Sequence, residues 1–268
     1  MSGSLSPGTD TLLSLLGVWL IGSALAILTT NTLDRIPRHQ SWTSPKPYCR
    51  SCAAALKWTD LIPVWSYLRS HGKCPYCGEP WPRRQIIIEI AEIAWVAIFI
   101  ARFGWSYPAI ITLIFGVGLI VITVLEFESG VLSDLLLVIM GSLGVIYILA
   151  FQRTDFPNAL TSLTAGGAVL FIYNVLRKFL SARHRADINE IKFAAVLGLF
   201  LGLPKILTAI LLAGLLETLW GVIYTYMLTR EPQIWTPRFP ALLSLSGLFV
   251  ILYGDNLIGL FQGIVGRL

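Results

Sequence analysis

Long apolar runs, separated by short polar segments, occupy almost the whole chain. A membrane-spanning helix needs about 20 predominantly apolar residues to cross a hydrocarbon core about 30 Å thick, and these runs approach or exceed that length. Hydrophobic residues make up 55 % of the 268 residues, charged residues only 13 %, and the mean hydropathy is +0.72. Soluble domains carry about 25 % charged residues, and a soluble chain of this length cannot bury so much apolar surface. The sequence therefore predicts an all-α, polytopic membrane protein.

We expect about eight transmembrane helices. The first run, near residues 11–29, follows a stretch without Lys or Arg, whereas a cleaved signal peptide begins with basic residues. We interpret it as a retained span, with a cleaved signal peptide as the alternative. No basic run is interleaved with aromatic residues, so we expect the lipid bilayer and no nucleic acid as a partner. The remaining runs lie near 86–103, 108–125, 131–151, 160–176, 191–203, 204–228 and 239–261.

The basic residues predict the orientation, because cytosolic loops of membrane proteins carry an excess of Lys and Arg. With the polar segment 31–85 in the cytosol, 16 of the 20 Lys and Arg residues lie on the cytosolic side. We therefore expect this segment and the loop around Arg183 in the cytosol, and both termini on the other side. The expected organisation is a first span (1–30), a cytosolic four-cysteine domain (31–85) and a membrane domain with seven spans (86–268).

All four cysteines lie in that polar segment, as Cys49, Cys52, Cys74 and Cys77. Each pair is C-x-x-C, the spacing with which two thiolates bind one Zn²⁺ ion. The 21 residues between the pairs slightly exceed the usual spacer, but the cost of loop closure grows only logarithmically with length. We predict a structural zinc knuckle. Two disulfides or free thiols are the alternatives, and disulfides require an oxidising compartment.

Carboxylates near the membrane face are the candidate functional residues, because charges near hydrocarbon are costly. Glu126 ends the third expected span and Glu190 begins the sixth, so the topology places both at a similar depth. Two such carboxyl groups share a proton, and the pair can activate water against a peptide bond. The alternative is that both acids merely end their helices among lipid headgroups. We expect Glu89 and Glu92 to reach the cytosolic surface, and Glu217 to pair with a polar group or mark a cavity.

Three stretches together resemble the bacterial type IV prepilin peptidases, a family of membrane aspartic proteases. The exit of the first span, GSALAILTTNTLDRIPR (22–38), is similar to the family's opening signature of the GSFLNVVIYRLPR type. The two C-x-x-C pairs and the residues up to the second span (49–89) look like its cytosolic domain. The tail TPRFPALLSLSGLFVILYGD (236–255) resembles its last-span motif. The resemblance covers nearly the whole chain, and the family's eight-span layout agrees with the runs found above.

The catalytic motifs of this family are altered here. Residues 126–134 match its D-x6-P-D pattern, with Glu in place of the catalytic Asp and Ser in place of Pro. Residues 187–192 match its GxGD motif and the Lys that follows, again with Glu in place of Asp and with neither glycine present. The resemblance implies a catalytic pair and two residues that orient the pair or the substrate: Glu126 and Glu190, and Asp134 and Lys192.

The resemblance implies an endopeptidase of the bacterial inner membrane that cleaves the leaders of type IV prepilins or pseudopilins at the cytosolic face. Many members also methylate the new N-terminus with S-adenosylmethionine, so this cofactor is implied by the resemblance alone. The alternative is a catalytically degenerate scaffold for pilin-like subunits. A transporter is disfavoured, because the acids cluster at one membrane face and not at the midplane.

Overall fold

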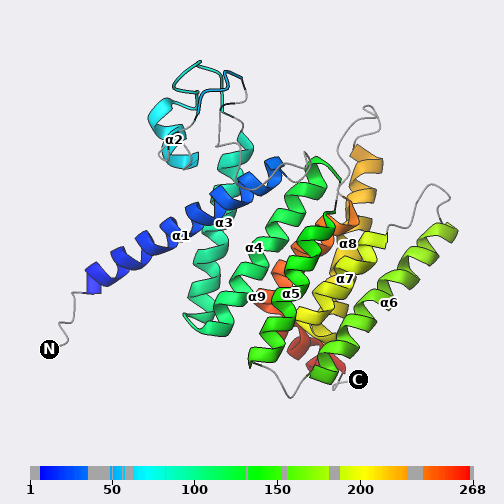
Figure 1. The fold of residues 1–268 in the computed structure, drawn as a ribbon. Coiled ribbons are helices and arrows are strands. Elements are labelled where there is room, and N and C mark those ends of the chain that lie inside the picture. The colour runs from blue at the N-terminus through cyan, green and yellow to red at the C-terminus, as the bar shows by residue number, and fades with distance from the viewer. Residues whose placement is uncertain are drawn as a thin grey trace. The chain divides into compact units, whose positions relative to one another are not determined.

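The structure is a computed structural model of the chain. Its described residues are 7–35, 49, 51–55, 57, 63–81, 83–130, 132–151, 156–180, 188–227 and 238–265. Within these residues the protein is all-helical, with nine helices and no extended strand (Figure 1). The chain forms two compact units, Met1–Trp105 and Ser106–Leu268. Asp187 and the loop around Arg183 lie outside the described residues, and the division expected at residues 30 and 85 stays a prediction.

The first unit contains α1 (Pro7–Arg35), the short α2 (Pro63–Ser70) and α3 (Arg83–Phe103). The long helices α1 and α3 pack along one another, and α2 also contacts α3. Arg84 at the start of α3 forms an ion pair with Asp34 at the end of α1. The four cysteines belong to this unit, and α2 lies between the two cysteine pairs in the sequence.

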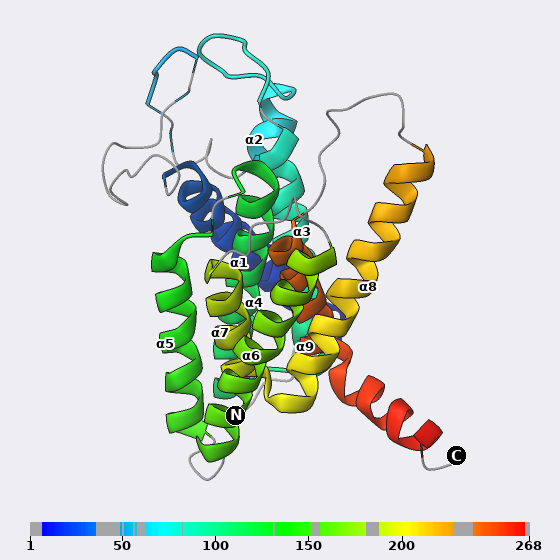
Figure 2. The same cartoon turned by 90° about the vertical axis from the view of Figure 1, so that its right-hand side faces the viewer.

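The second unit is a bundle of the six remaining helices. Among them α7 contacts α5, α6, α8 and α9, so it lies in the interior of the bundle, as Figure 2 shows. The helix α4 packs against α5 and α9. The helices of this unit are α4 (Tyr107–Glu128), α5 (Asp134–Phe151), α6 (Phe156–Leu180), α7 (Ile188–Leu201), α8 (Leu203–Met227) and α9 (Phe239–Val265).

Six helices of the described chain are long and apolar enough to cross a membrane: α1, α4, α5, α6, α8 and α9. The two further spans expected from the sequence correspond to α3 and α7. The helix α3 carries Glu89, Glu92 and Arg102 within its apolar run. The helix α7 has 14 residues, which is about 21 Å of helix and shorter than a hydrocarbon core. The all-α membrane architecture is confirmed.

A close approach of α6 and α7 positions the interior helix. A methyl group in place of the Gly198 hydrogen would collide with the carbonyl oxygen of Ser162, so only glycine allows the two backbones to lie this near. The helix α7 ends where Gly202 adopts a φ of +83°, a conformation that glycine tolerates and other residues avoid. Pro204 follows in the first turn of α8, a position compatible with proline.

Candidate active site and metal centre

The four cysteines form one compact cluster. Their sulfur atoms all lie within 4.8 Å of one another, and the Sγ atoms of Cys49 and Cys77 are 3.9 Å apart. A tetrahedral Zn²⁺ site with Zn–S bonds of about 2.3 Å has sulfur atoms about 3.8 Å apart. A disulfide bond is about 2.05 Å long, and none of the four cysteines forms one. The cluster fits a metal ion, in agreement with the zinc-knuckle prediction.

The backbone repeats one turn geometry around both pairs. The N–H of Ala53 donates to the carbonyl of Cys49 at 2.9 Å, and the N–H of Gly78 donates to that of Cys74 at 2.9 Å. Both Ala53 and Gly78 have a positive φ, of 59° and 75°. Such a conformation costs an alanine about 1–2 kcal/mol. The repeated turn brings each pair of thiols to the same side, as two-by-two binding of one ion requires.

Two of the four thiols have pKa values shifted in opposite directions. A hydrogen bond from the backbone of Cys52 lowers the pKa of the Cys49 thiol to about 7. The backbone N–H of Glu79 also lowers the pKa of Cys77, but desolvation and the neighbouring thiols outweigh it and raise this pKa to about 12. A divalent metal ion would allow all four thiols to ionise, because it stabilises all of the thiolates together.

The helices α4 and α7 run antiparallel, with a register that the side chains define. Phe115 of α4 stacks on Phe200 of α7, with ring centroids 3.9 Å apart and an interplanar angle of 5°. About one helical turn from this ring pair, a methyl group at Gly247 of α9 would lie 3.2 Å from Leu119 Cδ1 and 3.3 Å from Leu197 Cδ1. Leu119 and Leu197 therefore mark one depth in the bundle.

This register relates the two candidate catalytic acids. Glu126 follows Leu119 by seven residues, and Glu190 precedes Leu197 by seven residues. Seven residues are about two helical turns, or about 10.5 Å, and return almost to the same helix face. The two acids thus stand at the same end of the bundle, at equivalent depths. Both are buried, with relative exposures of 5 % for Glu126 and 9 % for Glu190.

An amide that the sequence analysis missed contacts one of these acids. Asn174 of α6 is 3 % exposed, and its Nδ2 donates to Glu190 Oε2 at 3.2 Å. Its Oδ1 atom has no hydrogen-bond partner among the described residues. Buried polar atoms are usually paired, so this oxygen is available to accept a further hydrogen bond. A lone amide among apolar neighbours, in LFIYNVL, was the signal available in the sequence.

The two residues expected to orient the pair contact one another. Lys192 Nζ lies 2.9 Å from Asp134 Oδ1, with side chains 48 % and 67 % exposed. The same ammonium group donates to Asn189 Oδ1 at 3.1 Å. This link joins the beginnings of α5 and α7. An ion pair this exposed stabilises the fold by only about 0–1 kcal/mol.

The acids of α3 do not reach the surface, and that expectation was wrong. Glu89 and Glu92 are both fully buried. Ser23 Oγ donates to Glu89 Oε1 at 2.6 Å, and Thr29 Oγ1 donates to Glu92 Oε1 at 2.9 Å. Burial is tolerated because α1 supplies a hydroxyl donor to each carboxyl group. These donors come from a helix more than 60 residues away in sequence, which no local pattern reveals.

Glu217 of α8 pairs with a polar group, as expected. The hydroxyl of Tyr173 donates to Glu217 Oε2 at 2.6 Å. Tyr173 also packs against Phe239 at the start of α9, with ring centroids 5.1 Å apart. Adjacent residues of α6 therefore bind acids on two different helices, since Tyr173 contacts α8 and Asn174 contacts α7.

Comparison with known proteins finds one family over most of the chain. A family model described as the bacterial peptidase A24 N-terminal domain matches residues 17–103, which include the four cysteines and α3. Many curated relatives are named prepilin leader peptidase/N-methyltransferase and align over about four fifths of the chain. The chain is therefore similar to the prepilin peptidase family over most of its length.

Three of these relatives come from different bacteria. The protein of Burkholderia pseudomallei (strain 1026b) is 26 % identical over 83 % of this chain and 73 % of its own length. The protein of Bacillus subtilis (strain 168) is 26 % identical over 85 % of this chain and 89 % of its own length. The protein of Pseudomonas aeruginosa PAO1 is 25 % identical over 80 % of this chain and 73 % of its own length. No solved structure matches the chain.

Proposed function

We propose that this protein is a member of the prepilin peptidase family and a membrane endopeptidase that cleaves the leader peptides of type IV prepilins or pseudopilins. The observation that carries the proposal is the shared depth of two buried acids, Glu126 and Glu190, on antiparallel helices of one bundle. The named activity of the relatives supports the same substrate class.

The chemistry follows from two carboxyl groups that share one proton. The ionised member removes a proton from a water molecule, whose oxygen attacks the carbonyl carbon of the scissile peptide bond. The protonated member donates its proton to the leaving nitrogen as the carbon–nitrogen bond breaks. The amide of Asn174 donates to Glu190, which holds that carboxyl group in one orientation. We assign the base to Glu190 on this ground, and the acid to Glu126.

The test is cleavage of a co-expressed prepilin, followed by the gel shift of the shortened product. Glu126→Gln and Glu190→Gln keep the side-chain shape and remove the acid–base function, so each is expected to abolish cleavage. Glu89→Gln is the matched control, because it replaces an equally buried acid of α3 and should leave cleavage intact. Cleavage that survives both of the first changes would reject the pair. An inert wild type would favour the degenerate scaffold.

For the cysteine cluster we propose one structural zinc ion bound by Cys49, Cys52, Cys74 and Cys77. Four thiolates complete a tetrahedral shell and leave no position for water or substrate, so the ion supplies folding energy and no catalysis. Elemental analysis of protein purified without chelator should give about one zinc per chain. No described residues are assigned to S-adenosylmethionine.

We further propose that the chain lies in the bacterial inner membrane with the cysteine cluster and the acid pair on the cytosolic side. The excess of Lys and Arg on that side supports this orientation. Reporter fusions at residue 183 and within segment 31–85 should both report the cytosol. A fusion at either place that reports the opposite compartment would overturn the orientation, independently of any result on cleavage.

A further inference from the structure

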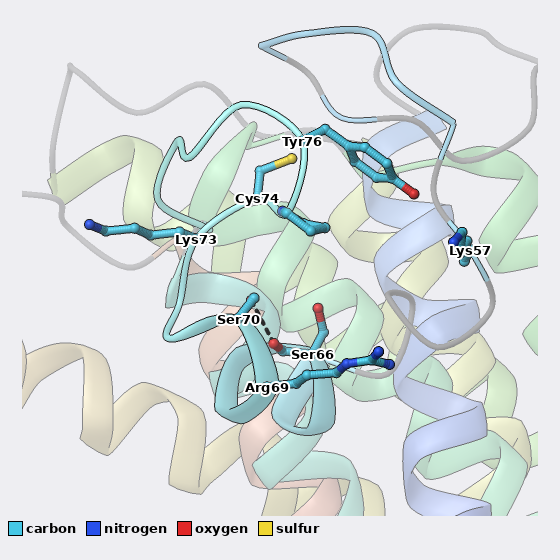
Figure 3. Close-up of a pocket in the computed structure, with 8 residues that line it drawn as sticks. Lys57, Ser66, Arg69, Ser70, Lys73, Cys74 and Tyr76 are labelled. Carbon is cyan, nitrogen blue, oxygen red and sulfur yellow. Dashed lines mark hydrogen bonds between the residues drawn. The ribbon is translucent and has the colours of Figure 1, made fainter.

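A pocket of about 320 Å³ lies between α2 and the second cysteine pair, within the first unit (Figure 3). This volume is at the small end of the range for ligand sites, suited to a headgroup-sized molecule. One wall is the face of α2 formed by positions three and four residues apart, and the other is the turn that carries Cys74. The polar residues that line it are Lys57, Ser66, Arg69, Ser70, Lys73 and Tyr76.

The lining is strongly basic. Three of the residues that line the pocket are cationic, and none carries a carboxylate. The cationic lining therefore favours an anion as the occupant of the pocket. Hydroxyl groups of serine and tyrosine supply further donors without adding charge.

The donors are not spread evenly around the pocket. In Figure 3 the guanidinium of Arg69, the amine of Lys57 and the hydroxyl of Tyr76 lie on one side, whereas the amine of Lys73 points to the opposite side. Ser70 is already engaged, since its hydroxyl donates to the Ser66 carbonyl at 2.6 Å. Arginine binds phosphate with two parallel hydrogen bonds. Further phosphate oxygens can then accept from the lysine and the tyrosine.

We propose that this pocket binds a phosphate group, held by Arg69, Lys57 and Tyr76. The group is either the phosphodiester of an anionic phospholipid headgroup or free phosphate. The former is expected to be the occupant in the cell, because a multi-pass membrane protein meets anionic lipids at its own interface. The pocket belongs to the first unit and the acid pair to the second, and occupancy of the pocket does not depend on the proposed cleavage reaction.

The experiment uses the full-length, zinc-loaded protein in detergent and native mass spectrometry of its adducts. The probes are phosphatidylglycerol, the phosphate-free lipid diacylglycerol and inorganic phosphate. The wild type should retain phosphatidylglycerol in preference to diacylglycerol. Arg69→Gln and Lys57→Gln should each lower the apparent affinity about tenfold, the loss expected for a charge-assisted hydrogen bond. Tyr76→Phe, which removes only a hydroxyl group, should lower it about threefold.

Lys73→Gln is the matched control, because it removes the same charge from the same pocket on the side away from Arg69. It should change the affinity less than twofold. Competition by inorganic phosphate against phosphatidylglycerol would identify a headgroup site, and retention of inorganic phosphate alone would identify free phosphate as the ligand. Both outcomes uphold phosphate recognition.

Three results would overturn the proposal. The first is no preference for either phosphate-bearing probe over diacylglycerol. The second is a loss with Lys73→Gln as large as that with Arg69→Gln, which would indicate diffuse surface charge. The third is a loss of zinc from Arg69→Gln or Lys57→Gln, measured by elemental analysis, because the cations would then serve the metal centre.

Discussion

Buried acids occur in both units of this protein, but they are held in different ways. Glu89 and Glu92 lie in the middle of α3, and each accepts a hydrogen bond from a hydroxyl of the single helix α1. Glu126 and Glu190 lie at the ends of two antiparallel helices. Within this second pair, Glu190 accepts a hydrogen bond from the amide of Asn174, which comes from a third helix.

The difference shows that burial alone does not identify a functional carboxyl group. A mid-helix acid with a hydroxyl donor on one neighbour is a means of joining two helices. An acid at a helix end, at the same depth as a second acid, is placed where a chain entering from outside the bundle can meet both. Four variants, taken from the largest expected effect to the smallest, separate these two roles.

The largest effect is expected for shortening both acids at the helix ends. The double change Glu126→Asp with Glu190→Asp withdraws each carboxyl group by one methylene, and a displacement of about 1 Å costs about a hundredfold in rate. The double change Glu89→Asp with Glu92→Asp shortens the α3 acids by the same amount and should leave the rate within about twofold. Prepilin cleavage rates measure both. Activity that rises in the first double variant would mean that the native Glu pair is a degenerate site.

The next effect concerns the residue that contacts Glu190. Asn174→Leu removes the amide donor at similar volume, and we expect the catalytic rate to fall about tenfold with KM little changed, because the lost bond is charge-assisted. The adjacent change Tyr173→Phe removes a hydrogen bond to Glu217 instead and serves as the control. Equal losses from the two variants would assign Asn174 to the general packing of α6 rather than to the acid pair.

A third variant tests the close approach that sets the depth of Glu190. Gly198→Ala forces α7 away from the Ser162 carbonyl and should lower stability by about 1–3 kcal/mol, the usual cost of overpacking. Gly167→Ala is matched to it, because its methyl group would lie 3.5 Å from the Ala195 Cβ, an ordinary contact. Thermal unfolding in detergent distinguishes them. If both variants melt alike, the α6–α7 contact is not limiting.

The smallest effect is expected in the first unit. Thr29→Val removes the donor to Glu92 and should cost about 1 kcal/mol of stability, the net value of one hydrogen bond, with cleavage unchanged. Thr30→Val is the control, because the Thr30 hydroxyl is buried without a partner among the described residues. That change should be neutral or slightly stabilising. A larger loss of stability from Thr30→Val than from Thr29→Val would contradict a stabilising hydrogen bond between Thr29 and Glu92.

The parts that could be predicted are those fixed by chemistry within a short stretch. The spacing of Cys49, Cys52, Cys74 and Cys77 follows from what one metal ion needs, and the sulfur atoms do gather as expected. The membrane architecture follows from apolar runs. The common depth of Glu126 and Glu190 follows from alternation of the spans, and the side-chain register agrees with it.

The parts that could not be predicted depend on contacts between distant helices. The hydroxyl donors of α1 decide that Glu89 and Glu92 are buried, and nothing near those acids in the sequence indicates them. Asn174 was missed because an isolated amide in a span is chemically ambiguous until its neighbour is known. Only the packing of α6 against α7 reveals that this neighbour is Glu190.

The shortness of α7 has a geometric consequence for what the proposed enzyme cuts. Its 14 residues rise about 21 Å, about 9 Å less than the hydrocarbon thickness. If the turn at Gly202 lies at one edge of the membrane, Glu190 at the other end lies below the opposite edge. The scissile bond must then enter the third of the bilayer that is nearest to this opposite edge. In the proposed enzyme, the length of α7 would therefore set which peptide bond of an extended stem reaches the acids.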